Sequence, residues 1–477
     1  MIKKIPKCKT KIVVTLGPST LSQKKIETLA KLGVSVFRIN FSHGTYAQHK
    51  ETIQSIREVE EKLNLPLAIL QDLQGPKIRL GEFESGTAFL KKDSEFILTT
   101  NKLKGNNRIS SITCKNIDKD VKKGELIYLN DGLIKLEIQK ITGKNIYTKV
   151  IESGIAGNHN GVNFPTSHLS VASITEKDKK DLKFGLENNI DMVAQSFIKT
   201  AEDVLKLKNL MKATGKVVPI IAKIEKWEAV KNLKEIVEVS DGIMVARGDL
   251  GVEMSIAEIP ITQKQIISLC NKKGKPVITA TQMLSSMVDN PTPTRAEVTD
   301  ISNAIFDGTD AVMLSNETAM GKFPIESVEM MKQIIQSTEK SSLFKSAAVE
   351  NIITPEYDVP DAIAHSAVAI AKSTKAKIII SATESGKTAM LVSKYKPPVP
   401  ILALTPTEKT LRFLLLKWGV FPVKVNTFKT VDEILDTGPE TAKHLHFLKK
   451  NNLYVITAGS HTGISGSTNL IKIDKIF

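Results

Sequence analysis

The sequence predicts an α/β protein: a (β/α)8 TIM barrel with a β-barrel domain inserted into it and a separate α/β domain after it. Short apolar segments alternate with segments of helical periodicity, one interval between them is too long for a loop, and the alternation returns near the carboxyl end. At 477 residues the chain also exceeds the size of one hydrophobic core, so two or three domains are expected.

Eight apolar segments of strand length indicate the barrel. They occupy residues 11–16, 34–40, 66–72, 190–196, 217–223, 241–246, 275–281 and 309–315. Most are separated by stretches with helical spacing, for example residues 22–32 and 49–63. Eight such alternations are what a (β/α)8 barrel requires, although a doubly wound open sheet would show the same pattern. We assign residues 1–72 and 170–345 to this unit.

The interval between the third and fourth segments indicates an inserted domain, residues 73–169. Roughly a hundred residues separate the two segments, far beyond the usual length of a βα loop. Between residues 81 and 165, short alternating segments are joined by hairpin signals such as LNDG at 129–132 and TGKN at 142–145. We predict a small β-barrel or sandwich on the rim of the (β/α)8 barrel, where it could close as a lid.

The last part of the chain, residues 346–477, reads as a separate α/β domain. A connector that includes residues 354–357 precedes it. Its expected strands, residues 376–382, 399–405, 453–458 and 470–474, lie among helical segments.

Composition excludes several classes of function. The 66 basic residues exceed the 51 acidic ones by 15, which suits anionic small ligands, nucleic acid or simply a lysine-rich surface. No basic stretch is interleaved with aromatic residues, so nucleic-acid binding is not expected. Cys8, Cys114 and Cys270 have no disulfide or zinc spacing, and no apolar run could form a signal peptide or membrane span. We therefore expect a cytoplasmic protein with no membrane association.

Polar residues end the barrel strands. The carboxyl ends of parallel strands share one edge, where ligands bind in this architecture. Side chains alternate with period two, so Lys223 and Glu225 share one face of the fifth strand. The other strand ends supply Arg38, Asn40 and Ser42; Gln71, Asp72, Gln74, Lys77 and Arg79; Arg247, Gly248 and Asp249; Thr279, Thr281 and Gln282; and Ser315, Asn316 and Glu317.

Together these residues would supply cations for an anionic substrate and carboxylates for a hard metal ion. Mg²⁺ takes one or two protein carboxylates, which Glu225 and Asp249 can provide, and phosphoryl transfer needs little beyond positioned positive charge. Each feature also has a plain alternative: a solvated ion pair at Lys223 and Glu225, a simple turn at RGDLG, or helix caps after the second strand. Their coincidence at one edge favours a site.

The motifs resemble those of the pyruvate kinase family, in order and spacing, from Lys9 almost to the end of the chain. The matching passages include TKIVVTLGPST, FRINFSHGT, DLQGPKIR, GVNFP, KIEKWEAV, SDGIMVARGDLGVE, ATQML, PTPTRAEVTDISNAIFDGTDAVMLSNETAMGKFP and TESGKTA. The resemblance implies a barrel domain, an inserted lid after the third strand and a carboxyl-terminal regulatory domain.

The resemblance also implies the reaction: transfer of a phosphoryl group from phosphoenolpyruvate to ADP, giving pyruvate and ATP in the last step of glycolysis (EC 2.7.1.40). Lys223 would lie against the migrating phosphoryl group, and Mg²⁺ or Mn²⁺ would be held by Glu225 and Asp249. The remaining roles implied are phosphoryl binding by Arg38, carboxylate binding by the backbone amides of Arg247, Gly248 and Asp249, enolate protonation assisted by Thr281, and nucleotide binding by Asn40, His43 and Arg79.

Two departures from the family pattern are informative. Many members hold K⁺ with residues that match Asn40, Ser42, Asp72 and a threonine, and carry a glutamate at position 77. Here Leu73 replaces the threonine and Lys77 the glutamate, as in the potassium-independent branch, so Lys77 would substitute for the monovalent cation and K⁺ would not be required. Asn160 stands where many members carry a lysine near the nucleotide, which leaves that contact open.

In the last domain, TESGKT resembles the family's loop for an effector phosphate. Thr383, Ser385, Gly386, Lys387 and Thr388 would form this allosteric site for a phosphorylated metabolite, completed by residues 459–469; the alternative is an ordinary turn with a helix cap. The resemblance further implies a homotetramer.

Two other functions stay open on the sequence. One is a different Mg²⁺-dependent barrel enzyme that acts on phosphoenolpyruvate or an enolate, against which the inserted lid and TESGKT argue. The other is a catalytically silent regulatory or RNA-binding relative, against which the intact Lys223, Glu225, Asp249 and Thr281 argue.

Overall fold

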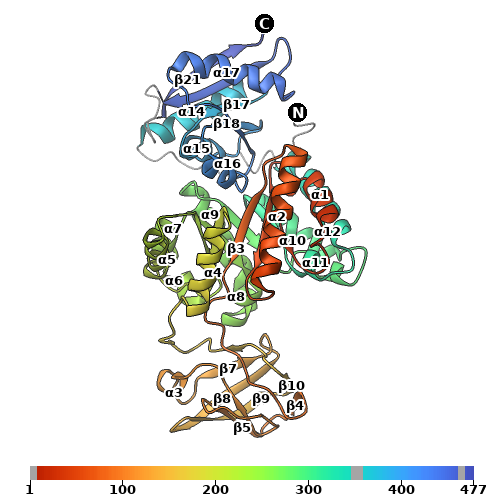
Figure 1. Cartoon of the computed structure of the whole chain (residues 1–477), viewed down its shortest axis with the longest axis vertical. Helices are drawn as coiled ribbons and strands as arrows, with labels where there is room; N and C mark the ends of the chain where they lie inside the picture. The colour runs from red at the N-terminus through yellow and green to blue at the C-terminus, as the bar shows by residue number, and fades with distance from the viewer. Residues whose placement is uncertain (1–7, 345–357, 460–467) are drawn as a thin grey trace.

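The computed structural model describes residues 8–344, 358–459 and 468–477 and divides into three successive units. Figure 1 shows a barrel surrounded by helices in the middle, the β-rich segment coloured orange at one end of the long axis, and the carboxyl-terminal α/β unit, coloured blue, at the other. The predicted connector at residues 354–357 lies outside the described residues.

Eight parallel strands form a closed barrel, which confirms the (β/α)8 barrel over an open sheet. Their order is β1-β16-β15-β14-β13-β12-β3-β2, and pairing of Lys11 in β1 with Ala311 in β16 closes the ring. The strands are β1 (Lys11–Leu16), β2 (Val36–Asn40), β3 (Ala68–Asp72), β12 (Met192–Gln195), β13 (Ile220–Ile224), β14 (Gly242–Ala246), β15 (Val277–Ala280) and β16 (Ala311–Leu314).

The fifth barrel strand, β13, begins later than predicted. Pro219 has no N–H to donate to a neighbouring strand, so regular pairing starts at Ile220 rather than at residue 217. The strand then ends at Ile224. Lys223 is therefore fixed within the strand, and Glu225 stands one residue beyond it.

Helices surround the barrel and cover it with their apolar faces. They are α1 (Gln23–Leu32), α2 (Tyr46–Leu63), α4 (Glu176–Glu187), α5 (Ala201–Ala213), α6 (Trp227–Lys231), α7 (Leu233–Val239), α8 (Arg247–Glu253), α9 (Ile259–Lys272), α10 (Arg295–Phe306), α11 (Asn316–Ala319) and α12 (Pro324–Lys340). Helix α2 begins at Tyr46, three residues before the predicted start, because Thr45 and Gln48 form a reciprocal capping box there.

The segment between β3 and β12 folds around its own apolar core. Its elements are β4 (Thr87–Leu90), β5 (Glu95–Thr99), β6 (Ile109–Ser111), α3 (Ile117–Asp120), β7 (Leu126–Leu129), β8 (Ile134–Thr142), β9 (Asn145–Glu152), β10 (Gly154–Gly157) and β11 (Val162–Asn163). One sheet has the order β11-β7-β8-β9-β5-β6, and β10 pairs with β4. Both hairpin signals form turns, between β7 and β8 and between β8 and β9.

The carboxyl-terminal unit is a five-stranded sheet of order β19-β18-β17-β20-β21, in which β21 is antiparallel to its neighbour. Its elements are α14 (Val359–Ser373), β17 (Ile379–Ala382), α15 (Lys387–Lys394), β18 (Ile401–Thr405), α16 (Glu408–Leu414), β19 (Val420–Lys424), α17 (Val431–His444), β20 (Leu453–Gly459) and β21 (Thr468–Lys475). The prediction missed β19, which contains Pro422. An edge strand tolerates proline, and β19 is at the edge of the sheet.

Among the helices of the described residues, none has both the length and the apolar character needed to cross a membrane.

Candidate active site

Lys223 is the centre of an ion network at the carboxyl edge of the barrel. Its ammonium lies 2.6 Å from Ser196 Oγ, 3.3 Å from Asp72 Oδ1 and 3.4 Å from Glu225 Oε2. Burial alone would lower the pKa of Lys223, but the carboxylates of Asp72 and Glu225 outweigh it, so the pKa is raised above the usual value. The lysine therefore carries a full, largely desolvated charge.

Asp72, at the end of β3, orders two cations. It accepts a hydrogen bond from Arg38 Nε at 2.6 Å and contacts Lys223, while Arg38 Nη1 donates to Thr15 Oγ1 at 2.9 Å. Burial tends to raise the pKa of Asp72, yet the charges of Lys223 and Arg38 prevail and lower it. A carboxylate whose charged form is favoured thus aligns the lysine and the arginine at the barrel mouth.

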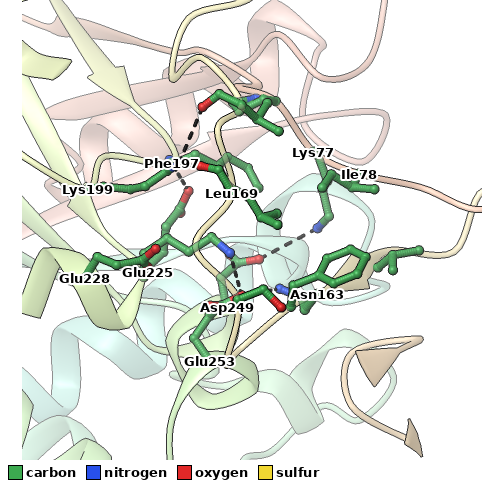
Figure 2. A pocket seen from close by; sticks show the side chains of 16 residues that line it. Lys77, Ile78, Asn163, Leu169, Phe197, Lys199, Glu225, Glu228, Asp249 and Glu253 are labelled. Atoms are coloured by element: carbon green, nitrogen blue, oxygen red, sulfur yellow. Dashed lines mark hydrogen bonds and ion pairs between the residues drawn. The ribbon is translucent and has the colours of Figure 1, made fainter. Parts of the chain in front are cut away.

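Two further carboxylates, those of Glu225 and Asp249, lie beside this network. Glu225 Oε1 accepts a hydrogen bond from Phe197 N at 2.6 Å, whereas the buried Oε2 has no hydrogen-bond partner. Burial raises the pKa of Glu225 to about 7. The side chain of Asp249 is 40% exposed. Both residues line a pocket between the barrel and the inserted unit, shown in Figure 2.

These two carboxylates fit a hard divalent cation. The buried Oε2 of Glu225 accepts no hydrogen bond, and its ion-pair partner among the described residues is the Lys223 ammonium at 3.4 Å, so a metal ion would supply further positive charge beside it. Among the described residues no group of three or more His, Cys, Asp or Glu side chains is arranged to hold a metal. Two carboxylates beside an open cavity leave coordination positions for water and substrate, as Mg²⁺ prefers.

Thr281 adopts a strained conformation at the end of β15. Its φ is 64° and that of Gln282 is 55°, a region that a β-branched residue rarely enters. Thr281 Oγ1 accepts a hydrogen bond from Gly248 N at 2.8 Å and donates to Ala280 O at 2.7 Å. The left-handed turn thereby brings the threonine hydroxyl to the first turn of α8.

The side chain of Arg247 turns away from the pocket and holds neighbouring elements in place. The buried guanidinium pairs with Asp300 of α10 at 2.6 Å, and Nη2 donates to Thr281 O at 2.7 Å. The side chain is therefore committed to holding the Thr281 turn against α8 and α10, while Gly248 and Asp249 face the site.

Two of the residues predicted to bind the nucleotide lie together, because His43 N donates a hydrogen bond to Asn40 O at 3.4 Å, whereas the third, Arg79, belongs to the inserted unit. Asn40 Oδ1 accepts a hydrogen bond from Ser42 N, and His43 is exposed at the same end of β2. Arg79 lies in the inserted unit, where Nη1 donates to His159 O at 3.0 Å. The side chain of Asn160 closes a turn by accepting from Gly157 N at 2.6 Å.

Lys77 extends from the inserted segment toward the carboxylate of Asp249. Its ammonium lies 3.7 Å from Asp249 Oδ1, and the two side chains face each other in Figure 2. Leu73 is buried in the barrel core.

Sequence reasoning missed Ser196 and Phe197, which hold Lys223 and Glu225. Both follow β12: Ser196 Oγ accepts a hydrogen bond from Lys223, and Phe197, which has a φ of 56°, donates its N–H to Glu225. The strand-end rule applied to the fourth strand would have found Ser196.

The TESGKT loop joins β17 to α15. Gly386 precedes the helix with a φ of 87°, and Ser385 and Lys387 are exposed. Thr388 Oγ1 shares a hydrogen bond of 2.7 Å with Thr468 Oγ1, at the start of β21, and Thr383 is buried. Most of the segment expected to complete this loop, residues 460–467, lies outside the described residues.

Comparisons with known proteins agree along the whole chain. The family profile described as pyruvate kinase, barrel domain, matches residues 7–328, and that described as pyruvate kinase, alpha/beta domain, matches residues 361–474. Pyruvate kinase of Thermotoga maritima is 45% identical over 470 residues, 98% of this chain and 99% of the relative. Pyruvate kinase of Clostridium acetobutylicum is 43% identical with the same coverage, and pyruvate kinase 2 of Synechocystis sp. is 44% identical over 98% of this chain and 79% of its own length. This chain therefore belongs to the pyruvate kinase family.

Proposed function

We propose that this protein is a Mg²⁺-dependent pyruvate kinase, which transfers the phosphoryl group of phosphoenolpyruvate to ADP and releases pyruvate and ATP. The observation that carries the proposal is the charged, desolvated Lys223, held by Asp72 and Ser196 beside the incompletely coordinated Glu225. Members of the family generally use Mg²⁺.

Lys223 and Arg38 receive the phosphoryl group. Both side chains form ion pairs with the same carboxylate, that of Asp72. Their positions relative to each other are therefore fixed before the substrate binds. Phosphoryl transfer depends mainly on such pre-positioned charge, because the equatorial oxygens remain anionic throughout. Glu225 and Asp249 hold the Mg²⁺, which supplies Lewis-acid stabilisation of phosphoryl and enolate oxygens.

The amides at the start of α8 receive the substrate carboxylate. Gly248 N donates to Thr281 Oγ1 in this structure, so a carboxylate placed there would compete for the same donor and release the threonine hydroxyl. Thr281 is then free to relay a proton through water to the enolate carbon. The strained φ of Thr281 supports this role, since backbone strain concentrates at functional sites.

Asn40, His43 and Arg79 serve the nucleotide and its phosphates. Arg79 belongs to the inserted unit and the other two to the barrel, so nucleotide binding is coupled to closure of that unit as a lid over the cavity. The functional domains under this proposal are the barrel (1–72 and 170–345), the lid (73–169) and the allosteric domain (346–477).

Lys77 replaces the monovalent cation, so K⁺ is not required. The ammonium reaches the rim of the site at Asp249, which supports a role for its charge there. A phosphorylated metabolite binds the exposed loop at Ser385 and Lys387 and activates the enzyme, which works as a cytoplasmic homotetramer.

A coupled assay tests the proposed reaction. Phosphoenolpyruvate, ADP and Mg²⁺ are supplied, and pyruvate is detected with lactate dehydrogenase and NADH. We expect pyruvate formation that depends on all three components. Absence of pyruvate would refute the proposal, and phosphate release from phosphoenolpyruvate without ADP would point to a different enzyme of this fold.

A further inference from the structure

Both connections between the inserted unit and the barrel touch the same helix, α8. On the outgoing connection Lys77 lies 3.7 Å from Asp249, and at the end of β11, where the returning connection begins, Asn163 Nδ2 donates to Glu253 Oε1 at 2.7 Å. Asp249 and Glu253 are four residues apart and so lie on one face of the helix, one turn from each other. Figure 2 shows all four side chains converging at the mouth of the cavity.

A buried ion pair joins the two segments that carry the metal carboxylates. Lys226 directly follows Glu225, and its ammonium lies 2.7 Å from Glu253 Oε1. The side chains of Lys226 and Glu253 are only 11% and 0% exposed, so removal of the lysine would leave a buried carboxylate without its charged partner. The pair therefore connects the end of β13 to the last turn of α8.

The carboxylate of Glu253 depends entirely on these two partners. Lys226 and Asn163 both bind Oε1, whereas Oε2 is buried and has no hydrogen-bond partner. A buried carboxylate with one unsatisfied oxygen is costly. The position of the Glu253 carboxylate is therefore tied to the position of Asn163.

We propose that Glu253 is a positioning residue that couples the lid connection to the metal site. Through Lys226 it fixes the separation of Glu225 and Asp249, and through Asn163 it transmits the position of the inserted unit to α8. The inference rests on the proposed metal site at Glu225 and Asp249. Because such coupling is reciprocal, metal binding in turn fixes the connection at Asn163.

Binding of Mn²⁺ to the purified full chain, followed by the paramagnetic resonance signal of the free ion, tests the coupling without any turnover. Lys226→Met is the decisive variant. Removing a positive charge near a cation site would by electrostatics alone tighten Mn²⁺ binding, whereas loss of positioning weakens it. We expect the Mn²⁺ dissociation constant to rise by about 10-fold or more, the usual effect of losing a partner of a metal ligand. Glu253→Gln should weaken binding by a similar factor.

Glu228→Gln is the matched control. Glu228 lines the same pocket, is similarly buried and also has an unpartnered oxygen, but its contact is with His168 Nδ1 at 3.9 Å and it does not join the two segments. Its Mn²⁺ affinity should stay within about two-fold of the wild type, below the loss expected for a positioning partner.

Asn163→Leu separately tests the link to the inserted unit, since it removes the amide without changing charge. In the wild type we expect Mn²⁺ to slow hydrogen exchange of the segment around residue 163, and in this variant that protection should be lost. Mn²⁺ binding by Lys226→Met as tight as in the wild type would overturn the coupling and leave the proposed function intact. If the wild type itself bound no Mn²⁺, the proposed metal site would be wrong.

Discussion

Lys223 is the residue on which the proposed chemistry depends most. Replacement by Met removes the cation proposed to act on the phosphoryl group, while Asp72 keeps Arg38 as its partner and the strand stays buried. We expect Lys223→Met to lower kcat by at least ~10³ and to leave the affinity for phosphoenolpyruvate largely intact, because the lost interaction strengthens in the transition state.

Steady-state kinetics of Lys223→Met beside Lys183→Met, an exposed lysine on α4, provide the measurement and its control. The Lys183 variant should behave like the wild type. A loss confined to KM would mean that Lys223 only binds substrate.

Lys77 predicts the response to monovalent cations. Under the proposed role of Lys77, its ammonium supplies the positive charge that a bound K⁺ would otherwise provide, and the side chain of Leu73 offers no oxygen ligand. Activity in sodium-only or Tris buffer should therefore equal activity with added K⁺. Initial rates at matched ionic strength decide the matter, and a large stimulation by K⁺ would contradict the assignment.

Much of the candidate site could be read from single residues, because period two in a strand fixes which side chains share a face. That rule predicted the common face of Lys223 and Glu225, and these side chains lie 3.4 Å apart. It could not predict that the side chain of Arg247 turns to Asp300, or that Thr281 adopts a positive φ. Both depend on residues distant in sequence, and the residue type of Thr281 argues against its conformation.

At the scale of elements, α8 connects the site to its surroundings. Arg247 ties the first turn of this helix to α10 through Asp300 and holds the left-handed turn of β15 through Thr281 O. The sequence predicted the strand before Arg247 and the loop that contains it. It indicated for this arginine only a place in a turn whose backbone amides could bind a carboxylate.

Arg247→Met should therefore impair catalysis through Thr281 rather than through substrate charge. We expect kcat to fall by about 10- to 100-fold, as is usual for loss of a supporting residue. Arg247→Lys should not restore it, because a single ammonium cannot reach Asp300 and two backbone carbonyls at once. Kinetics combined with circular dichroism test this. Full activity in the lysine variant would contradict a role for the guanidinium geometry.

At the scale of the whole molecule, the carboxyl-terminal unit closes the amino-terminal end of the barrel. Phe413, Leu415 and Leu416 extend the apolar core of the barrel interior, and Asp310 at the start of β16 accepts hydrogen bonds from Lys417 Nζ and Trp418 N. These partners are more than a hundred residues apart, so local periodicity carried no signal for them. The sequence predicted the separate units, but their packing depends on tertiary contacts alone.

Lys11 makes this junction sensitive to pH. Its ammonium is buried between the two units, donates to Val420 O at 2.6 Å and lies 4.4 Å from the centre of the Phe421 ring. Burial, only partly offset by Glu339 and other acidic groups, lowers the pKa of Lys11 from 10.5 to about 8. Below pH 8 the folded protein therefore bears the full cost of a buried charge. Between about pH 8 and 10.5 the folded state loses this proton while the unfolded state keeps it, so stability rises with pH.

Lys11→Met removes this dependence. The stability of the variant relative to the wild type should be greatest near pH 7 and should decline by up to about 3 kcal/mol toward pH 10.5. Lys396, whose pKa is also lowered to about 8, titrates in both proteins and cancels in the comparison. Melting temperatures across this range give the difference, with Lys183→Met as the exposed control, whose difference from the wild type should not vary. If the difference in stability between Lys11→Met and the wild type were also independent of pH, the pKa of Lys11 in the folded protein would not be lowered.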